Sequence, residues 1–386
     1  MITFETIARA ARPEEVFGRV ADAADLKRKF HALARKVHPD LHKGQRRAQD
    51  AFAKLAGLAE EAERRLAAGV YGTAASSPAP AAGPTVIERG RARYVVGDAL
   101  PDADLCGVYR AERADGASTQ RVVVKVAAAM DDNDLVAREA EALRALISPT
   151  APPDADLHAR ARGGAKLSTD ERRTLYLPRL VDSFRLPDPA HGPRQVNVLR
   201  DEDEYASFLA VRTAYPAGLV LEDAVWMSNR LFEGLGYVHQ RGWVHGAVLP
   251  PHVLVLPSYH GAKIIDWSYS TCDERVPAVA SRWRAFYAPE IVNRQRATPA
   301  TDIYMAARCL AYVLGASHGG PPPSLIRADA SGKEAAAAWF VGFLRKCLSN
   351  DPRDRPQDAW DARAEVDHNM RSLFGPRKFH KFEMPR

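Results

Sequence analysis

The sequence contains few cysteines, and their arrangement implies neither a metal site nor a disulfide framework. The four cysteines among 386 residues stand at positions 106, 272, 309 and 347, and no CxxC pair occurs. This spacing excludes a zinc ribbon and a disulfide scaffold, and it predicts a reducing compartment, the cytoplasm. Long apolar runs are also absent, so we expect no transmembrane helix and no membrane partner. Residues 1–12 lack the apolar core and the cleavage site of a secretory signal.

A large excess of charge of either sign is absent too. The chain has 54 Lys and Arg against 48 Asp and Glu, a formal net charge of +6 that is spread along its length. No basic motif interleaved with aromatic residues and no zinc-finger spacing occurs, so we expect no nucleic-acid partner. With 46% hydrophobic and 26% charged residues, the composition is that of a folded globular protein, and 386 residues predict two or three domains.

The composition changes sharply after Tyr71. Residues 72–84 contain only Gly, Thr, Ala, Ser and Pro, with no charge and no large apolar side chain. Such a stretch buries too little apolar surface to order itself. We therefore predict a linker over 72–90, between a helical domain at 1–71 and a second domain that begins at Arg91.

Two amphipathic helices are expected before this linker. In the first, apolar residues repeat at i, i+4, i+7 and i+11, and they are Leu26, Phe30, Leu33 and Val37. Its N-cap is predicted at Asp25 and its end before Pro39. Its other face is basic and carries Lys27, Arg28, Arg35 and Lys36. A second helix repeats Phe52, Leu55, Ala59, Ala62 and Leu66 on one side, so the two are expected to form an antiparallel hairpin.

The turn between these helices reads His38-Pro39-Asp40. With it, the segment from about residue 13 to 70 resembles a J-domain of the DnaJ family, in which an HPD tripeptide joins two antiparallel helices. The resemblance implies that the tripeptide contacts a DnaK-type chaperone and stimulates its ATPase. It also implies that the basic residues of the first helix steer the domain toward an acidic surface of that partner. The alternative is a plain turn beside a solvated basic face. The usual client-binding modules of the family do not follow, so client recruitment is expected from elsewhere in the chain.

The second domain contains short motifs in a fixed order. They are the β-branched run that ends in Lys125, a helix over 131–146 with Glu139 and Glu141, the loop 244–252, the apolar run that ends in Asp266, Ala288-Pro289-Glu290, Asp302 at the head of an apolar helix, and the segment 351–356 with Arg355. Residues two apart on a helix point about 200° away from each other, so only one of the two glutamates can face Lys125.

In this order, the motifs resemble the eukaryotic-like protein kinase fold over about residues 91–365, with a small lobe at 91–213 and a large lobe at 214–365. The resemblance implies that Lys125, Glu139 and Asp266 bind a nucleotide, with magnesium at Asp266. It also implies structural roles for the pair Glu290–Arg355, and for Asp302 as the brace of the catalytic loop. The fold class expected for the chain is therefore multi-domain: an all-α J-domain hairpin followed by an α+β bilobal kinase-like domain.

The residues that this resemblance requires for phosphoryl transfer are replaced. In the loop that starts at His245, Ala247 stands where the base aspartate belongs and Gly246 where an arginine belongs. The second metal ligand is His252, a poor substitute because magnesium prefers oxygen ligands. The glycines of the phosphate loop are replaced too, by Pro101, Ala103 and Cys106. No catalytic residue is therefore expected.

Together the two resemblances imply a J-domain co-chaperone with a catalytically impaired kinase-like domain that binds an unknown protein client or regulates the output. ATP with magnesium is expected as a weak cofactor at most, and whether the lysine trio binds nucleotide or only braces the small lobe stays open. The alternatives are an atypical active Ser/Thr kinase or another nucleotide-dependent transferase, and a scaffold without catalysis. The tail at 366–386 alternates basic and aromatic residues and is either a docking peptide or a strap over the large lobe.

Overall fold

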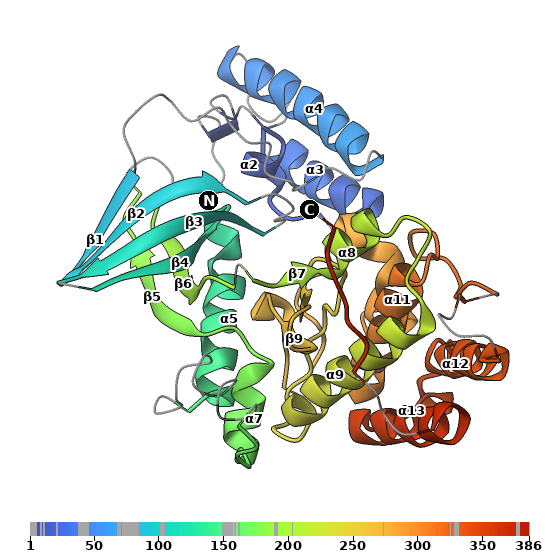
Figure 1. The fold of residues 1–386 in the computed structure, drawn as a ribbon. Coiled ribbons are helices and arrows are strands. Elements are labelled where there is room, and N and C mark those ends of the chain that lie inside the picture. The colour runs from blue at the N-terminus through green and yellow to red at the C-terminus, as the bar shows by residue number, and fades with distance from the viewer. Residues whose placement is uncertain are drawn as a thin grey trace.

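The computed structural model describes residues 6–7, 10, 12–20, 22–37, 46–67, 71, 85–100, 105–116, 118–148, 157, 160, 163–188, 192–202, 204–272, 274–324, 326–327, 332–375 and 379–385. In this part of the chain the fold is mixed α+β (Figure 1). The α-helices are α2 (Glu14–Phe17), α3 (Ala23–Val37), α4 (Arg46–Ala67), α5 (Asn133–Leu146), α7 (Thr169–Leu175), α8 (Phe208–Ala214), α9 (Leu221–His239), α10 (Pro289–Val292), α11 (Pro299–Val313), α12 (Glu334–Cys347) and α13 (Ala359–Phe374). Within the described ranges, none of them is both long and apolar enough to cross a membrane.

The helices α2, α3 and α4 share one apolar core, and we call the described residues from 6 to 71 the N-terminal helical unit. Leu26 of α3 and Leu55 of α4 are fully buried in it, as the apolar repeats predict. The N-cap prediction at Asp25 is wrong. The helix begins at Ala23, and the Asp22 carboxylate accepts the backbone N–H of Asp25 at 2.8 Å. Asp25 therefore lies inside the first turn, where its carboxylate interacts favourably with the positive end of the helix dipole.

A six-stranded antiparallel sheet follows, with strand order β1-β2-β3-β4-β6-β5. Its strands are β1 (Thr85–Arg89), β2 (Ala92–Ala99), β3 (Cys106–Asp115), β4 (Ser118–Ala127), β5 (Leu180–Leu186) and β6 (Arg194–Arg200). The linker predicted over 72–90 therefore ends too late, because Thr85–Arg89 pairs with β2 and buries Ile87. Three consecutive β-branched residues, Thr85, Val86 and Ile87, suit a strand better than a linker. Residues 72–84 lie outside the described residues.

Helix α5 packs against this sheet and is fixed to β6 by two asparagines (Figure 1). The side-chain amide of Asn133 donates to Pro193 O at 2.9 Å, and its Oδ1 accepts from Gln195 N at 2.6 Å. One turn further on, Asn197 of β6 donates to Val136 O at 2.6 Å. Because buried amides are costly to leave unpaired, these contacts hold α5 at one position on the sheet.

The remaining helices pack around a second, larger core beside a small sheet in the order β7-β8-β9. These strands are β7 (Ala206–Ser207), β8 (Val253–Leu256) and β9 (Gly261–Ile264). Short 3₁₀ helices η2 (Met130–Asp132), η3 (Trp267–Tyr269), η4 (Ser281–Phe286) and η5 (Pro352–Asp354) complete the described elements. Helices α9 and α11 lie at the centre of this core, where Phe232 and Leu310 are fully buried.

The described part of the C-terminal tail packs along α9 as a strap, one of the two predictions for it. Phe382 is 5% exposed and its ring lies 5.7 Å from that of Tyr215 and 5.8 Å from that of Trp226. His380 adds a contact at 2.9 Å to the carboxylate of Asp223 on α9. Burial of the Phe382 ring contributes to this attachment.

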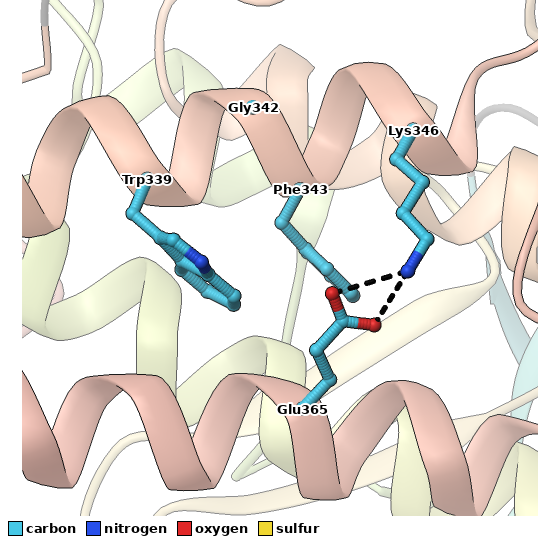
Figure 2. A pocket seen from close by; sticks show the side chains of 5 residues that line it. All are labelled: Trp339, Gly342, Phe343, Lys346 and Glu365. Atoms are coloured by element: carbon cyan, nitrogen blue, oxygen red, sulfur yellow. Dashed lines mark hydrogen bonds and ion pairs between the residues drawn. The ribbon is translucent and has the colours of Figure 1, made fainter.

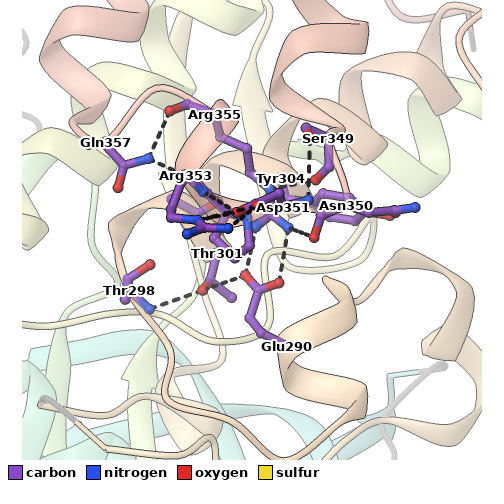
Figure 3. A network of polar contacts seen from close by, with 12 residues as sticks. Glu290, Thr298, Thr301, Tyr304, Ser349, Asn350, Asp351, Arg353, Arg355 and Gln357 are labelled. Carbon is purple, nitrogen blue, oxygen red and sulfur yellow. Dashed lines mark hydrogen bonds and ion pairs between the residues drawn. The ribbon is translucent and has the colours of Figure 1, made fainter.

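The predicted contact between Glu290 and Arg355 is present as a buried two-bond ion pair (Figure 3). The guanidinium donates to the two carboxylate oxygens at 2.6 and 3.0 Å, and both side chains are at most 5% exposed. Thr301 of α11 donates to the same carboxylate at 2.9 Å. The pair joins α10 and the neighbouring α11 to the loop before α13, where Arg355 stands 65 residues after Glu290.

Breaking this pair is expected to destabilise the fold strongly. Arg355→Leu leaves the Glu290 carboxylate buried without a counter-charge, which lowers the free energy of unfolding by about 3–5 kcal/mol. The matched control is Lys346→Leu, since Lys346 forms a half-exposed pair with Glu365, and exposed pairs contribute less than about 1 kcal/mol. Urea unfolding curves of both variants test the prediction. Equal losses in the two variants would contradict it.

Candidate functional site

A buried lysine between two carboxylates lies where the sheet meets the second core. Lys125 of β4 donates to Glu139 Oε1 of α5 at 2.8 Å and to Asp266 Oδ1 at 2.9 Å. Asp266 follows β9 and precedes η3. The side chains of the three residues are 6%, 0% and 14% exposed, respectively. Three segments that are distant in the sequence thus meet at one ammonium group.

The charges of this cluster stabilise one another. Burial by itself would lower the pKa of Lys125, but the carboxylates of Asp266 and Glu139 outweigh it and raise that pKa well above its usual value. Burial likewise opposes ionisation of Asp266, yet the ammonium group of Lys125 holds the pKa of this carboxyl below its usual value. Lys125 and Asp266 are therefore charged at neutral pH. Asp266 also has φ +62°, a left-handed conformation that is uncommon for a residue other than glycine.

Of the two glutamates of α5, only one contacts Lys125 in the structure. Glu139 faces Lys125, whereas Glu141 is exposed. A residue that sequence reasoning missed holds the glutamate in place, because Asn197 of β6 donates to Glu139 Oε2 at 2.9 Å. The signal for it was a single amide inside the apolar run Val196-Asn197-Val198, which is a costly position for an unpaired polar group.

The backbone at the start of the loop that begins at His245 is held by Asp302 of α11. The Asp302 carboxylate accepts the backbone N–H groups of His245 and Gly246 at 2.8 and 2.9 Å, and it contacts His239 Nε2 at 2.9 Å. Gly246 has φ +73°, and a Cβ atom there would lie 2.8 Å from Tyr269 O. A larger side chain at this position would therefore require the backbone to move. The next residue, Ala247, is 0% exposed.

His252 is aimed at Asp266, a contact that the sequence did not predict. Its Nδ1 lies 2.9 Å from Ala247 O, and since a carbonyl oxygen only accepts, Nδ1 carries the hydrogen. Nε2 then faces Asp266 Oδ2 at 3.4 Å. The imidazole therefore presents Nε2, and not its Nδ1–H, to the carboxylate.

These donors do not fit a two-ligand magnesium site. Magnesium prefers hard oxygen ligands in near-octahedral geometry. Of the two carboxylates in the cluster, Glu139 is fully buried against Lys125 and Asn197, so only Asp266 remains. It is already bonded to Lys125, and the second predicted ligand is the imidazole nitrogen of His252. Across the described ranges, no group of three or more His, Cys, Asp or Glu side chains is placed to hold a metal ion.

The other predicted site residues lie elsewhere. Lys27 and Arg28 are exposed on α3. The side chains of Arg35 and Lys36 lie outside the described residues, as do His38, Pro39, Asp40, Pro101 and Ala103. Cys106 is buried at the start of β3, opposite Ala127 of β4.

A separate shallow hollow of about 270 Å³ lies between α12 and α13 (Figure 2). Its lining consists of Trp339, Gly342, Phe343, Lys346 and Glu365. The ion pair Lys346–Glu365 closes one end, and the rings of Trp339 and Phe343 stack at 5.5 Å. The hollow is mainly apolar, holds no second charge pair among its lining residues, and lies far from α5 (Figure 1).

No protein-family model matches the chain. The chemistry of the candidate site therefore depends on its own geometry. The Lys125 cluster presents charged groups that are already paired with one another; within the loop of residues 244–252, His252 faces Asp266 and Ala247 is fully buried. The methyl group of Ala247 cannot accept a proton from an incoming hydroxyl.

The buried His245 predicts how stability depends on pH. Burial lowers the pKa of His245 from 6.5 to about 4; the carboxylates of Asp302 and Asp266 raise it in part, and His252 lowers it further. Between pH 6.5 and 4 the unfolded chain binds a proton at this residue that the folded chain does not. Its contribution to stability is therefore present above pH 6.5 and is lost as the pH falls toward 4.

A His245→Gln variant tests this. The pH dependence of its free energy of unfolding should be flatter between pH 6 and 4.5, by up to about 1.4 kcal/mol per pH unit. The comparison between the two proteins is needed because His260, with a pKa of about 4, adds a slope of the same sign, and Asp132, with a pKa of about 6, adds one of the opposite sign. Parallel curves for variant and parent would refute the assignment.

Proposed function

We propose that this chain is a J-domain co-chaperone whose second unit has a protein-kinase-like fold without phosphoryl-transfer activity and serves to bind a client or regulate the output. Support for the first part comes from the HPD tripeptide at residues 38–40 between α3 and α4, together with the shared core of these helices. The exposed Lys27 and Arg28 on α3 suit an acidic partner surface.

The observation that carries the second part is the buried methyl group of Ala247. In a kinase-like site this position supplies the carboxylate that accepts the proton of the attacking hydroxyl, and a positioned general base is worth about 10²- to 10⁴-fold in rate. The supports of the loop are nevertheless kept, since Asp302 holds the backbone on its N-terminal side and Glu290–Arg355 is intact. The replaced residue belongs to the chemistry, whereas the residues that support the loop are kept. This difference favours a unit that is retained for binding.

The partners that follow are a DnaK-type chaperone and a protein client of unknown identity. ATP with magnesium is at most a weak ligand in this proposal. The Lys125 ammonium is already shared between two carboxylates, and the His252 imidazole takes the place of an oxygen ligand. The proposed compartment is the cytoplasm, where such chaperones work.

Stimulated ATP hydrolysis by a DnaK-type chaperone tests the first part. The unmodified protein should raise steady-state turnover, and His38→Gln should abolish the increase, because the tripeptide is proposed to contact the chaperone. Lys54→Gln, which changes an exposed residue of α4, is the matched control and should leave the increase unchanged. Absence of stimulation by the unmodified protein would remove the proposal.

A second candidate, an atypical kinase or another nucleotide-dependent transferase, is favoured by the intact trio Lys125, Glu139 and Asp266. Thermal unfolding with ATP separates the two. A bound nucleotide at a hundredfold excess over its Kd would stabilise the fold by about 2.7 kcal/mol. We expect little or no stabilisation by millimolar MgATP, no improvement over ATP without magnesium, and no transfer of label from γ-labelled ATP. Label transfer that depends on Asp266 would instead establish the transferase.

A further inference from the structure

The turn at residues 17–20 of the N-terminal helical unit is built to present one arginine. Lys29 of α3 donates to Phe17 O at 3.1 Å and also to Arg19 O. Tyr71, at the far end of the unit, donates its hydroxyl to Gly18 O at 3.0 Å. Three successive carbonyl groups are thus fixed by side chains from both ends of the unit. The turn is a rigid feature of the unit, and Arg19 projects from it.

Arg19 reaches the acidic turn that precedes α5, on the other side of the linker. Its Nε lies 2.7 Å from Asp132 Oδ1, and its Nη2 donates to Asp131 O at 2.7 Å and to Asp134 Oδ1 at 3.2 Å. One guanidinium therefore contacts three residues of the turn, Asp131, Asp132 and Asp134. Planar, multiply bonded contacts of this kind are where arginine differs most from lysine.

The turn at residues 17–20 and the acidic turn before α5 are complementary in shape as well as in charge. Gly18 has φ +58°, and a Cβ atom there would lie 3.3 Å from Asp131 Oδ2. The side chain of Asp132 is 7% exposed, and its other oxygen accepts the backbone N–H of Ala129 at 3.1 Å. Burial raises the pKa of Asp132 to about 6 even though Arg19 beside it acts in the opposite direction. Without Arg19 this carboxylate would be buried with no counter-charge, which is costly.

The acidic turn is also a fixed platform. It leads directly into α5, which Asn133 and Asn197 attach to β6. Glu139, which holds Lys125, stands seven residues after Asp132 in the sequence, or roughly 10 Å along the helix axis. A unit bound to this turn is therefore held at a fixed position relative to the buried lysine cluster.

We propose that the acidic turn Asp131–Asp134 is a docking surface for the chain's own N-terminal helical unit, with Arg19 as the residue that attaches it, so that the two units act as one body. Lys27 and Arg28 stay exposed in the docked arrangement. A partner of α3 can therefore bind without undocking, and it meets the second unit at a fixed separation. This consequence for a chaperone rests on the proposed function, whereas the docking itself does not.

Pulsed electron-spin distance measurement on the full chain tests the docking. Spin labels at exposed Lys54 of α4 and exposed Arg93 of β2, in a Cys272→Ser background, report the separation of the two units without other exposed cysteines. The parent should give one narrow distance distribution. Arg19→Asp should broaden it, because the turn then meets like charge. Arg64→Asp, which changes an exposed arginine that is paired with Glu61 of the same helix, should leave it narrow.

Charge reversal completes the test. Combining Arg19→Asp with Asp132→Arg should restore the narrow distribution, and pairing it with Asp134→Arg provides a second reversal at an exposed residue in case the buried position does not accept arginine. A broad distribution in the parent, or a narrow one in Arg19→Asp, would overturn the docking. Chaperone stimulation measured on the same proteins is an independent readout: its absence beside a narrow distribution would remove the proposed function and leave the docking intact.

Discussion

The contact between Lys125 and the carboxylates of Glu139 and Asp266 is the interaction on which the rest of this structure depends. It joins β4, α5 and the segment after β9, so it fixes how the six-stranded sheet meets the second core. Buried ion pairs contribute little net stability compared with apolar packing, but removing one partner is strongly unfavourable. The cluster therefore restricts the arrangement of its three segments more than it stabilises the fold. Asn197 extends it by fixing the second oxygen of Glu139.

The same cluster bears on the proposal that the site has kept its supports without the chemistry. Each charge in it is satisfied by another charge of the chain, and His252 adds a further group that faces Asp266. Beside it, Asp302 holds the backbone of a loop whose central side chain is only a methyl group. In the proposed function, such supports without a reactive group serve binding. The N-terminal helical unit, which contacts the start of α5 through Arg19, is proposed to supply the activity.

Local patterns in the sequence predicted the elements that depend on local physics. Apolar repeats gave α3 and α4, and the β-branched run that ends in Lys125 gave β4, whereas the choice of Glu139 over Glu141 came from the resemblance to the kinase fold. Boundaries were less certain because neighbouring residues compete for the same role. Asp22 rather than Asp25 accepts the first-turn N–H, and the segment assigned to the end of the linker pairs as β1.

Contacts between distant segments could not be predicted in this way. Neither Arg19 with Asp132 nor His252 with Asp266 leaves a periodic signal, since each depends on how two separately folded segments meet. The acidic run at 131–134 was visible in the sequence, but its partner 112 residues away was not. Residues 38–40 lie outside the described residues, so the tripeptide that motivates the proposed function is known from the sequence alone.

The central claim is that the output comes from the N-terminal helical unit and that the Lys125 cluster serves the architecture. The most direct measurement is chaperone-stimulated ATP hydrolysis with an Asp266→Asn protein, which keeps the shape of the side chain, leaves Glu139 on Lys125 and removes the one carboxylate suited to a metal. The account predicts stimulation equal to that of the unmodified protein. Loss of stimulation in a variant that remains folded would show that the cluster is part of the chemistry and would contradict the account.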